Sequence, residues 1–139
     1  MPRLTRWFIK TALVYFVAAL IVGGLLLARS AFEWPAGIAA LTPVYFHLLM
    51  VSWVTQLIFG MLFWMLPKYS KEQPRGNERL AWAAYGLINV GLLLRAIGEP
   101  WVTLQPEAGA GWLLAVSAVL QLLGGWAFIG NIWLRVKER

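Results

Sequence analysis

The only histidine of the chain, His47, lies within a long apolar segment, TPVYFHLLMVSWVTQLIFGMLFWMLPKY, at residues 42–69. Hydrocarbon offers no partner to the nitrogens of an imidazole, so a histidine inside a membrane helix indicates a functional site. Imidazole is also the side chain here that best suits haem iron or a transition metal. At α-helical spacing its face carries an apolar row that could flank a porphyrin or pack against another helix: Met50, Val51, Val54, Ile58, Met61 and Met65.

A second candidate is Arg95, near the outer end of the third apolar segment and at roughly the depth of His47. A guanidinium binds carboxylates through two parallel hydrogen bonds, so Arg95 could neutralise the propionates of a haem whose iron His47 ligates. Two other roles stay open for Arg95. It could extend to lipid headgroups, or it could pair with Glu99 four residues along the helix.

Two alternatives to a haem ligand also stay open for His47. Its ring could bond a backbone carbonyl or a tyrosine across a helix interface and have only a packing role. It could instead bind copper together with Met50 from several chains, because imidazole and thioether are suitable ligands for that metal.

The elements that carry these residues are predicted to be membrane helices. Of the 139 residues, 60% are hydrophobic and 13% are charged, whereas soluble domains have about 25% charged residues. A span needs about 20 apolar residues, and four stretches approach or exceed that length: 7–28, 43–66, 80–97 and 111–134. The pattern predicts an all-α integral membrane four-helix bundle, a single domain over residues 1–139 surrounded by membrane lipid.

The positive charges predict the orientation of the bundle. Ten of the twelve Lys and Arg lie in the N-terminal segment, in the loop before the third helix, or in the C-terminal tail. Such residues stay on the cytoplasmic side, so both termini are expected to be cytoplasmic, in the inner membrane of a bacterial or archaeal cell. Although the sequence pI is near 10.2, the basic residues cluster between apolar runs, which argues against a nucleic-acid partner.

Residue types that are missing or rare exclude several classes of function. Zero cysteines exclude disulfides, iron–sulfur clusters, thiolate zinc sites and covalently attached haem. The chain has no Asp, and Gly98-Glu99-Pro100 is expected to end the third helix, so all six Glu are predicted in loops or terminal segments. A proton- or cation-coupled transporter needs a carboxylate within the membrane and is therefore disfavoured.

Several residues mark helix ends and helix contacts. Thr42 and Pro43 are typical of an N-cap and a first helical residue, and Asn77 can cap the third helix. Glycines in the first and fourth segments permit close helix approach: Gly23, Gly24, Gly124, Gly125 and Gly130. Polar side chains indicate that the fourth helix faces protein: Ser117, Gln121 and Asn131. Four helices bury rather little polar surface, so association with further chains is expected.

The second apolar segment resembles the second helix of the catalytic subunit of haem–copper oxidases and nitric-oxide reductases. The resemblance rests on four features of this sequence: His47, Ser52-Trp53, Phe59-Gly60 and Leu66-Pro67-Lys68. The other helices match only in hydropathy. The resemblance implies that this helix runs from outside to inside and that His47 is an axial ligand of a b-type haem in respiratory electron transfer.

The chain also departs from that family. The full subunit uses further histidines for a second haem and a copper, and none can exist here because His47 is alone. The chain is therefore not expected to be an enzyme on its own. The family fold has three four-helix arcs, so a chain resembling one arc could act as a homo-oligomer, a trimer by analogy, or within a larger respiratory complex. The alternative function is a cofactor-free accessory or assembly subunit of such a complex.

Overall fold

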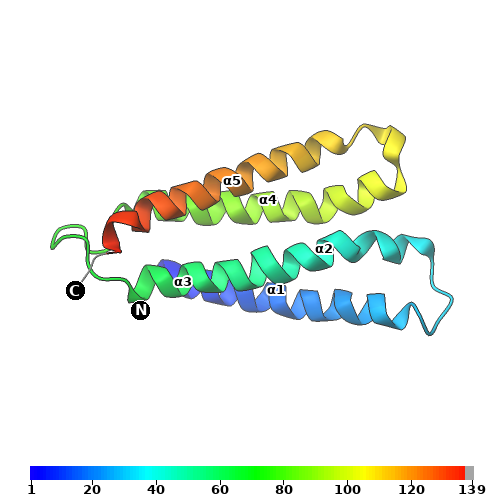
Figure 1. Cartoon of the computed structure of the whole chain (residues 1–139), viewed down its shortest axis with the longest axis horizontal. Helices are drawn as coiled ribbons and strands as arrows, with labels where there is room; N and C mark the ends of the chain where they lie inside the picture. The colour runs from blue at the N-terminus through cyan, green and yellow to red at the C-terminus, as the bar shows by residue number, and fades with distance from the viewer. Residues whose placement is uncertain (137–139) are drawn as a thin grey trace.

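The computed structural model describes residues 1–136, which form two antiparallel pairs of helical segments (Figure 1). The first pair consists of α1 (Arg3–Ala28) and the second span. That span is a continuous run of four segments: the 3₁₀ segment η1 (Ala36–Leu41), α2 (Thr42–His47), the π-helical segment η2 (Leu48–Thr55) and α3 (Gln56–Met65). The second pair consists of α4 (Glu78–Leu104) and α5 (Gly111–Ile132), with short 3₁₀ turns at η3 (Pro106–Ala108) and η4 (Trp133–Arg135).

The all-α prediction is confirmed, with four helices long and apolar enough to cross a membrane: Arg3–Ala28, Gly37–Met65, Glu78–Leu104 and Gly111–Arg135. Figure 1 shows that α1 begins and η4 ends at the same end of the bundle, here called the terminal end; η1 and η3 lie at the opposite, distal end. The cytoplasmic location of the terminal end stays a prediction from charge. Two residues counted in that prediction, Lys137 and Arg139, lie outside the described residues.

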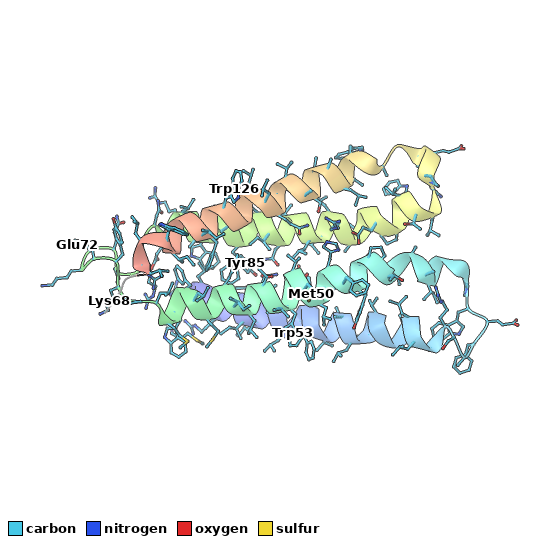
Figure 2. All side chains as sticks on the ribbon, viewed as in Figure 1. Met50, Trp53, Lys68, Glu72, Tyr85 and Trp126 are labelled. Carbon is cyan, nitrogen blue, oxygen red and sulfur yellow. The ribbon has the colours of Figure 1, made fainter. Side chains whose placement is uncertain are left out.

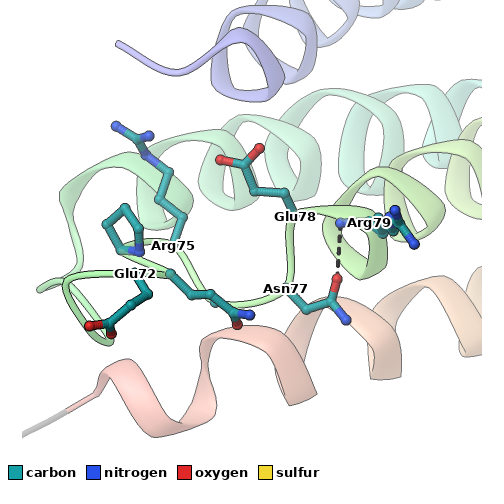
Figure 3. Close-up of a pocket in the computed structure, with 8 residues that line it drawn as sticks. Glu72, Arg75, Asn77, Glu78 and Arg79 are labelled. Atoms are coloured by element: carbon teal, nitrogen blue, oxygen red, sulfur yellow. Dashed lines mark hydrogen bonds between the residues drawn. The ribbon is translucent and has the colours of Figure 1, made fainter.

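The second span begins earlier than predicted, because the small apolar residues of η1 continue the helical path. Thr42 does not cap α2; its Oγ1 donates to the Ala39 carbonyl at 2.9 Å. His47 therefore lies farther from the start of its span than expected. The predicted cap at Asn77 is confirmed. Its Oδ1 accepts from the backbone N–H of Arg79 at 3.0 Å (Figure 3) and from that of Leu80 at 3.2 Å.

The third span extends past Gly98-Glu99-Pro100, so its predicted end at residue 97 is wrong. Pro100 removes a single backbone donor, and α4 continues to Leu104 because close packing on α5 holds this stretch helical. A Cβ on Gly98 would lie only 3.0 Å from the Leu114 side chain. Glu99 is therefore inside a span and only 6% exposed, which corrects the expectation that every Glu lies in a loop or terminal segment. The argument against a transporter from the lack of an intramembrane carboxylate no longer holds.

Close glycine contacts join α4 to α5. A Cβ on Gly124 would lie 3.1 Å from the Ala84 carbonyl oxygen, and one on Gly91 would lie 3.0 Å from the Ser117 carbonyl oxygen. The prediction of close approach is thus confirmed for Gly124. Gly125 and Gly130 make no close approach within the four-helix unit, because a Cβ there would meet nothing within 4 Å. Sequence identifies a glycine on a helix but not the side on which the neighbouring helix lies.

The polar side chains of α5 face protein, as predicted. Ser117 is fully buried and its Oγ donates to the Gly91 carbonyl at 2.7 Å, while Gln121 Nε2 donates to that same Oγ at 2.9 Å. Asn131 Nδ2 donates to the Arg75 carbonyl at 3.3 Å. These bonds satisfy polar groups for which hydrocarbon would offer no partner.

The two helix pairs meet through an aromatic core and one amide pair. The rings of Phe59 and Phe128 stack with centroids 3.9 Å apart, and Phe8 meets Phe128 edge-on at 5.9 Å. Nearer the middle of the bundle, Gln56 and Asn89 exchange two amide hydrogen bonds of 3.2 and 3.1 Å. Gln56 is fully buried, so this exchange gives both amides partners between the pairs.

Arg135 joins the pairs at the terminal end. Its side chain is 1% exposed and donates to three backbone carbonyls near the end of α3, those of Phe63, Leu66 and Pro67, at 2.9–3.1 Å. The last carbonyls of a helix have no partner within the helix, and α3 ends at Met65 with Leu66 as its C-cap. The arginine of the fourth span therefore caps the second.

Substitution Arg135→Met is expected to lower the free energy of unfolding by about 3 kcal/mol, because it leaves these carbonyls without their charged donor. Thermal unfolding in detergent, followed by circular dichroism, measures the change. Arg79→Met is the matched control, because that side chain is exposed. Equal midpoints for the two variants would contradict a capping role for Arg135.

Candidate functional site

His47 is held where α2 passes into η2, opposite α4. Its Nδ1 lies 3.0 Å from the Pro43 carbonyl oxygen, four residues earlier on its own helix. The same nitrogen lies 3.4 Å from Oε1 of Glu99 on α4. Since a backbone carbonyl can only accept a hydrogen bond, Nδ1 is the donor to Pro43 and carries the N–H of the imidazole. Nε2 then carries the lone pair, and it makes no hydrogen bond to any residue in 1–136.

Glu99 connects this histidine to Arg95. Arg95 Nε donates to Oε1 of Glu99 at 2.6 Å, one helical turn away on α4. The Glu99 side chain is 6% exposed, and those of Arg95 and His47 are 27% and 28% exposed. A carboxylate this deeply buried requires a nearby positive charge, which Arg95 supplies. The pairing with Glu99 that the sequence left open for Arg95 is therefore present.

The second carboxylate oxygen of Glu99, Oε2, is buried and has no hydrogen-bond partner among the described residues. An unpaired buried acceptor is costly, so its retention is compatible with a functional site rather than with simple packing. Arg95 also has unused hydrogen-bond donors, because neither of its Nη nitrogens bonds any residue of the described part of the chain.

The eight residues after His47 form a π-helical segment, η2. Two side chains of this segment donate to backbone carbonyls five residues earlier. Ser52 Oγ donates to the His47 carbonyl at 3.2 Å, and Thr55 Oγ1 donates to the Met50 carbonyl at 2.9 Å. π-helical turns are uncommon in helices and occur frequently at functional sites. Because η2 has more residues per turn than an α-helix, the residues on the same side as His47 differ from those expected at α-helical spacing.

The other two predicted site residues, Met50 and Val54, lie on η2. Met50, labelled in Figure 2, is 59% exposed, and Val54 is half-buried. The side of this span that faces the bundle instead carries Leu48, Ser52, Gln56 and Gly60. Met50 therefore faces out of the four-helix unit, as do Ile58 and Met65 further along, which are 49% and 69% exposed.

Sequence reasoning identified His47 and Arg95 but placed Glu99 outside the membrane. The available signal was the i, i+4 spacing of Arg95 and Glu99, which pairs opposite charges only if the helix continues through Pro100. Gln56 had no assigned role, and its partner proves to be Asn89. Both are polar residues within apolar spans, which is the signal that predicts such a partner.

Comparison with known proteins identifies two similar curated proteins, both from Thermus thermophilus. One cytochrome c oxidase subunit 1 is 31% identical over 83 residues, which cover 59% of this chain and 15% of that protein. Another cytochrome c oxidase subunit 1 is 31% identical over 80 residues, which cover 57% of this chain and 74% of that sequence. The chain thus spans a small part of the first relative and about three quarters of the second. No protein-family model and no solved structure matches the chain.

Substitution Glu99→Ala is expected to lower the free energy of unfolding by about 2 kcal/mol, because it leaves the guanidinium of Arg95 without its partner in a poorly hydrated place. The double variant Arg95→Met with Glu99→Ala is expected to recover most of that loss. A thermal double-mutant cycle in detergent measures the coupling. Additive effects of the two single substitutions would contradict a buried ion pair.

Proposed function

Because the chain belongs to the family of cytochrome c oxidase subunit 1, we propose that it is a b-type haem-binding membrane protein of respiratory electron transfer. The similarity and the four membrane-length helices fit a respiratory membrane protein. The observation that carries the haem proposal is the state of His47. Its Nδ1 hydrogen-bonds the Pro43 carbonyl and lies 3.4 Å from the Glu99 carboxylate, while Nε2 bonds no residue of 1–136.

The donors present fit an axial ligand of haem iron. Histidines that ligate metals commonly donate their other ring N–H to a carboxylate or a backbone carbonyl, which fixes the ring and makes the ligating nitrogen more basic. In His47 the acceptor is the Pro43 carbonyl, and the Glu99 carboxylate lies 3.4 Å from the same nitrogen. When bound, haem iron supplies one-electron redox chemistry.

Arg95 and Glu99 have separate tasks in this proposal. Glu99 orients the ring of His47 through Oε1, and Arg95 balances the charge of that carboxylate through Nε. The two Nη nitrogens of Arg95 are the groups that would bind a propionate, since a guanidinium forms paired hydrogen bonds with carboxylates. Arg95 can thus serve Glu99 and a propionate with different nitrogens.

The position of Met50 bears on the oligomeric state. A planar group on His47 that also contacts Met50 and Val54 would lie at the outer surface of the four-helix unit, because Met50 is 59% exposed. Its second face would then need lipid or another chain. We therefore propose a homo-oligomer, with a trimer suggested by analogy with the three arcs of the family fold, or association with larger respiratory subunits, in the inner membrane.

A cofactor-free accessory or assembly subunit is the second candidate, and one observation favours it. The hydrogen bond to Pro43 and the contact with Glu99 give His47 a packing role within the chain alone. Copper is less well supported, because residues 1–136 contain no group of three His, Cys, Asp or Glu that could hold a metal ion. A copper site would need His47 and Met50 from several chains.

We expect purified protein to give a pyridine haemochrome of haem b and a reduced-minus-oxidised absorption difference, and His47→Ala to lose both. The matched control Thr55→Ala, on the same span, is expected to keep them, since Thr55 bonds only the Met50 carbonyl. Metal analysis of the same samples separates iron from copper. Colourless wild-type protein whose stability equals that of His47→Ala would refute the haem proposal and leave the accessory-subunit function.

Native mass spectrometry tests the oligomer separately. Haem is expected in species that contain more than one copy of the chain, because the exposed side of η2 needs a second surface. The haem-free His47→Ala protein reports whether association depends on the cofactor. Haem carried by single chains alone would contradict a shared site while leaving the ligand assignment intact.

A further inference from the structure

A groove lies between the distal halves of α1 and α2, away from the contact of His47 with Glu99. It opens on the outer surface of the four-helix unit, and its volume is about 500 Å³. Its lining is mostly apolar, and three of its large side chains are strongly exposed: Leu20, Leu27 and Phe46 at 57%, 78% and 56%. Arg29, at the end of α1, is the charged residue of the lining.

Two adjacent glycines give the groove its shape. A Cβ on Gly23 would lie 2.8 Å from the Tyr45 ring, so this glycine lets the ring pack directly on α1. A Cβ on Gly24 would meet nothing within 4 Å, so this position forms the hollow of the groove. The sequence predicted close helix approach at both positions, and the structure confirms it only for Gly23.

The mouth of the groove is positively charged. Arg29 is exposed and forms no ion pair with the residues described. Arg95, the only other Lys or Arg outside the clusters of the terminal end, is paired with Glu99. Arg29 is therefore the remaining Lys or Arg of the distal end, and it lines the groove directly after the last residue of α1.

We propose that this groove binds an anionic phospholipid, with an acyl chain along Gly24 and the phosphate at Arg29. A flexible chain can enter a hollow left by one missing side chain. A second helix cannot approach as easily, because Leu20 and Leu27 project on either side of Gly24 and hold another backbone away. The guanidinium suits a phosphate oxygen in both charge and geometry. This inference does not depend on haem binding.

Native mass spectrometry of delipidated protein, titrated with dioleoylphosphatidylglycerol or dioleoylphosphatidylcholine, tests the proposal. Wild type is expected to retain one phosphatidylglycerol in preference to phosphatidylcholine. Gly24→Leu is expected to weaken retention about tenfold, because the new side chain fills the hollow that the acyl chain would occupy. Arg29→Gln is expected to reduce the preference for phosphatidylglycerol about fivefold while leaving retention of phosphatidylcholine unchanged.

Gly125→Leu is the matched control for bulk, because Gly125 is also a helical glycine whose Cβ would meet nothing within 4 Å. It is expected to bind phosphatidylglycerol as wild type does. Equal retention by wild type, Gly24→Leu and Arg29→Gln would overturn the proposal. A change in the number of chains per particle in Gly24→Leu, without a change in lipid retention, would also overturn it and assign the groove to a second copy.

Discussion

A buried carboxylate that touches both a histidine and an arginine determines how the distal half of this bundle is arranged. Glu99 must lie on α4 one turn from Arg95, and it must face the start of η2 to reach His47. The charge is tolerable only because the three side chains are held together, since a lone carboxylate at 6% exposure would be strongly disfavoured. This contact fixes the register between the two helix pairs at the distal end, as Arg135 fixes it at the terminal end through the carbonyls near the end of α3.

Local chemistry was enough to predict the spans, the Asn77 cap and the protein-facing side of α5. Apolar length requires a helix in a membrane, and the amide of Asn77 finds its partners within three residues. The helix ends near Thr42 and Pro100 depend instead on packing. Pro100 is a helix breaker by local rules, yet α4 continues because Gly98 packs closely on α5. A single sequence does not contain that contact, so the position of Glu99 could not be derived from it.

The candidate site was predictable in its chemistry and not in its geometry. His47 was singled out because it is the only imidazole in the chain, and Arg95 because it is a charge in an apolar span. Glu99 was considered as a partner of Arg95 but not of His47, because the helix was expected to end before it. The neighbours of His47 were inferred from a period of about 3.6 residues. The π-helical turns of η2 break that period, and Ser52 and Thr55 bond carbonyls five residues back instead. No motif in the sequence signals this change of period.

The polar side chains of the bundle fall into two sets. Those with hydrogen-bond partners within the chain hold the fold, and those with unpaired nitrogens can bind a ligand. Four polar side chains form hydrogen bonds to other residues of the chain and so stabilise the fold: Gln56, Asn89, Ser117 and Asn131. His47 and Arg95 use one nitrogen each on Glu99, and their remaining nitrogens bond nothing in the described chain. Met50, three residues after His47 on η2, is exposed. A site whose orienting contacts lie inside the unit, and whose unpaired nitrogens belong to partly exposed side chains, is suited to a ligand held between this chain and a neighbour.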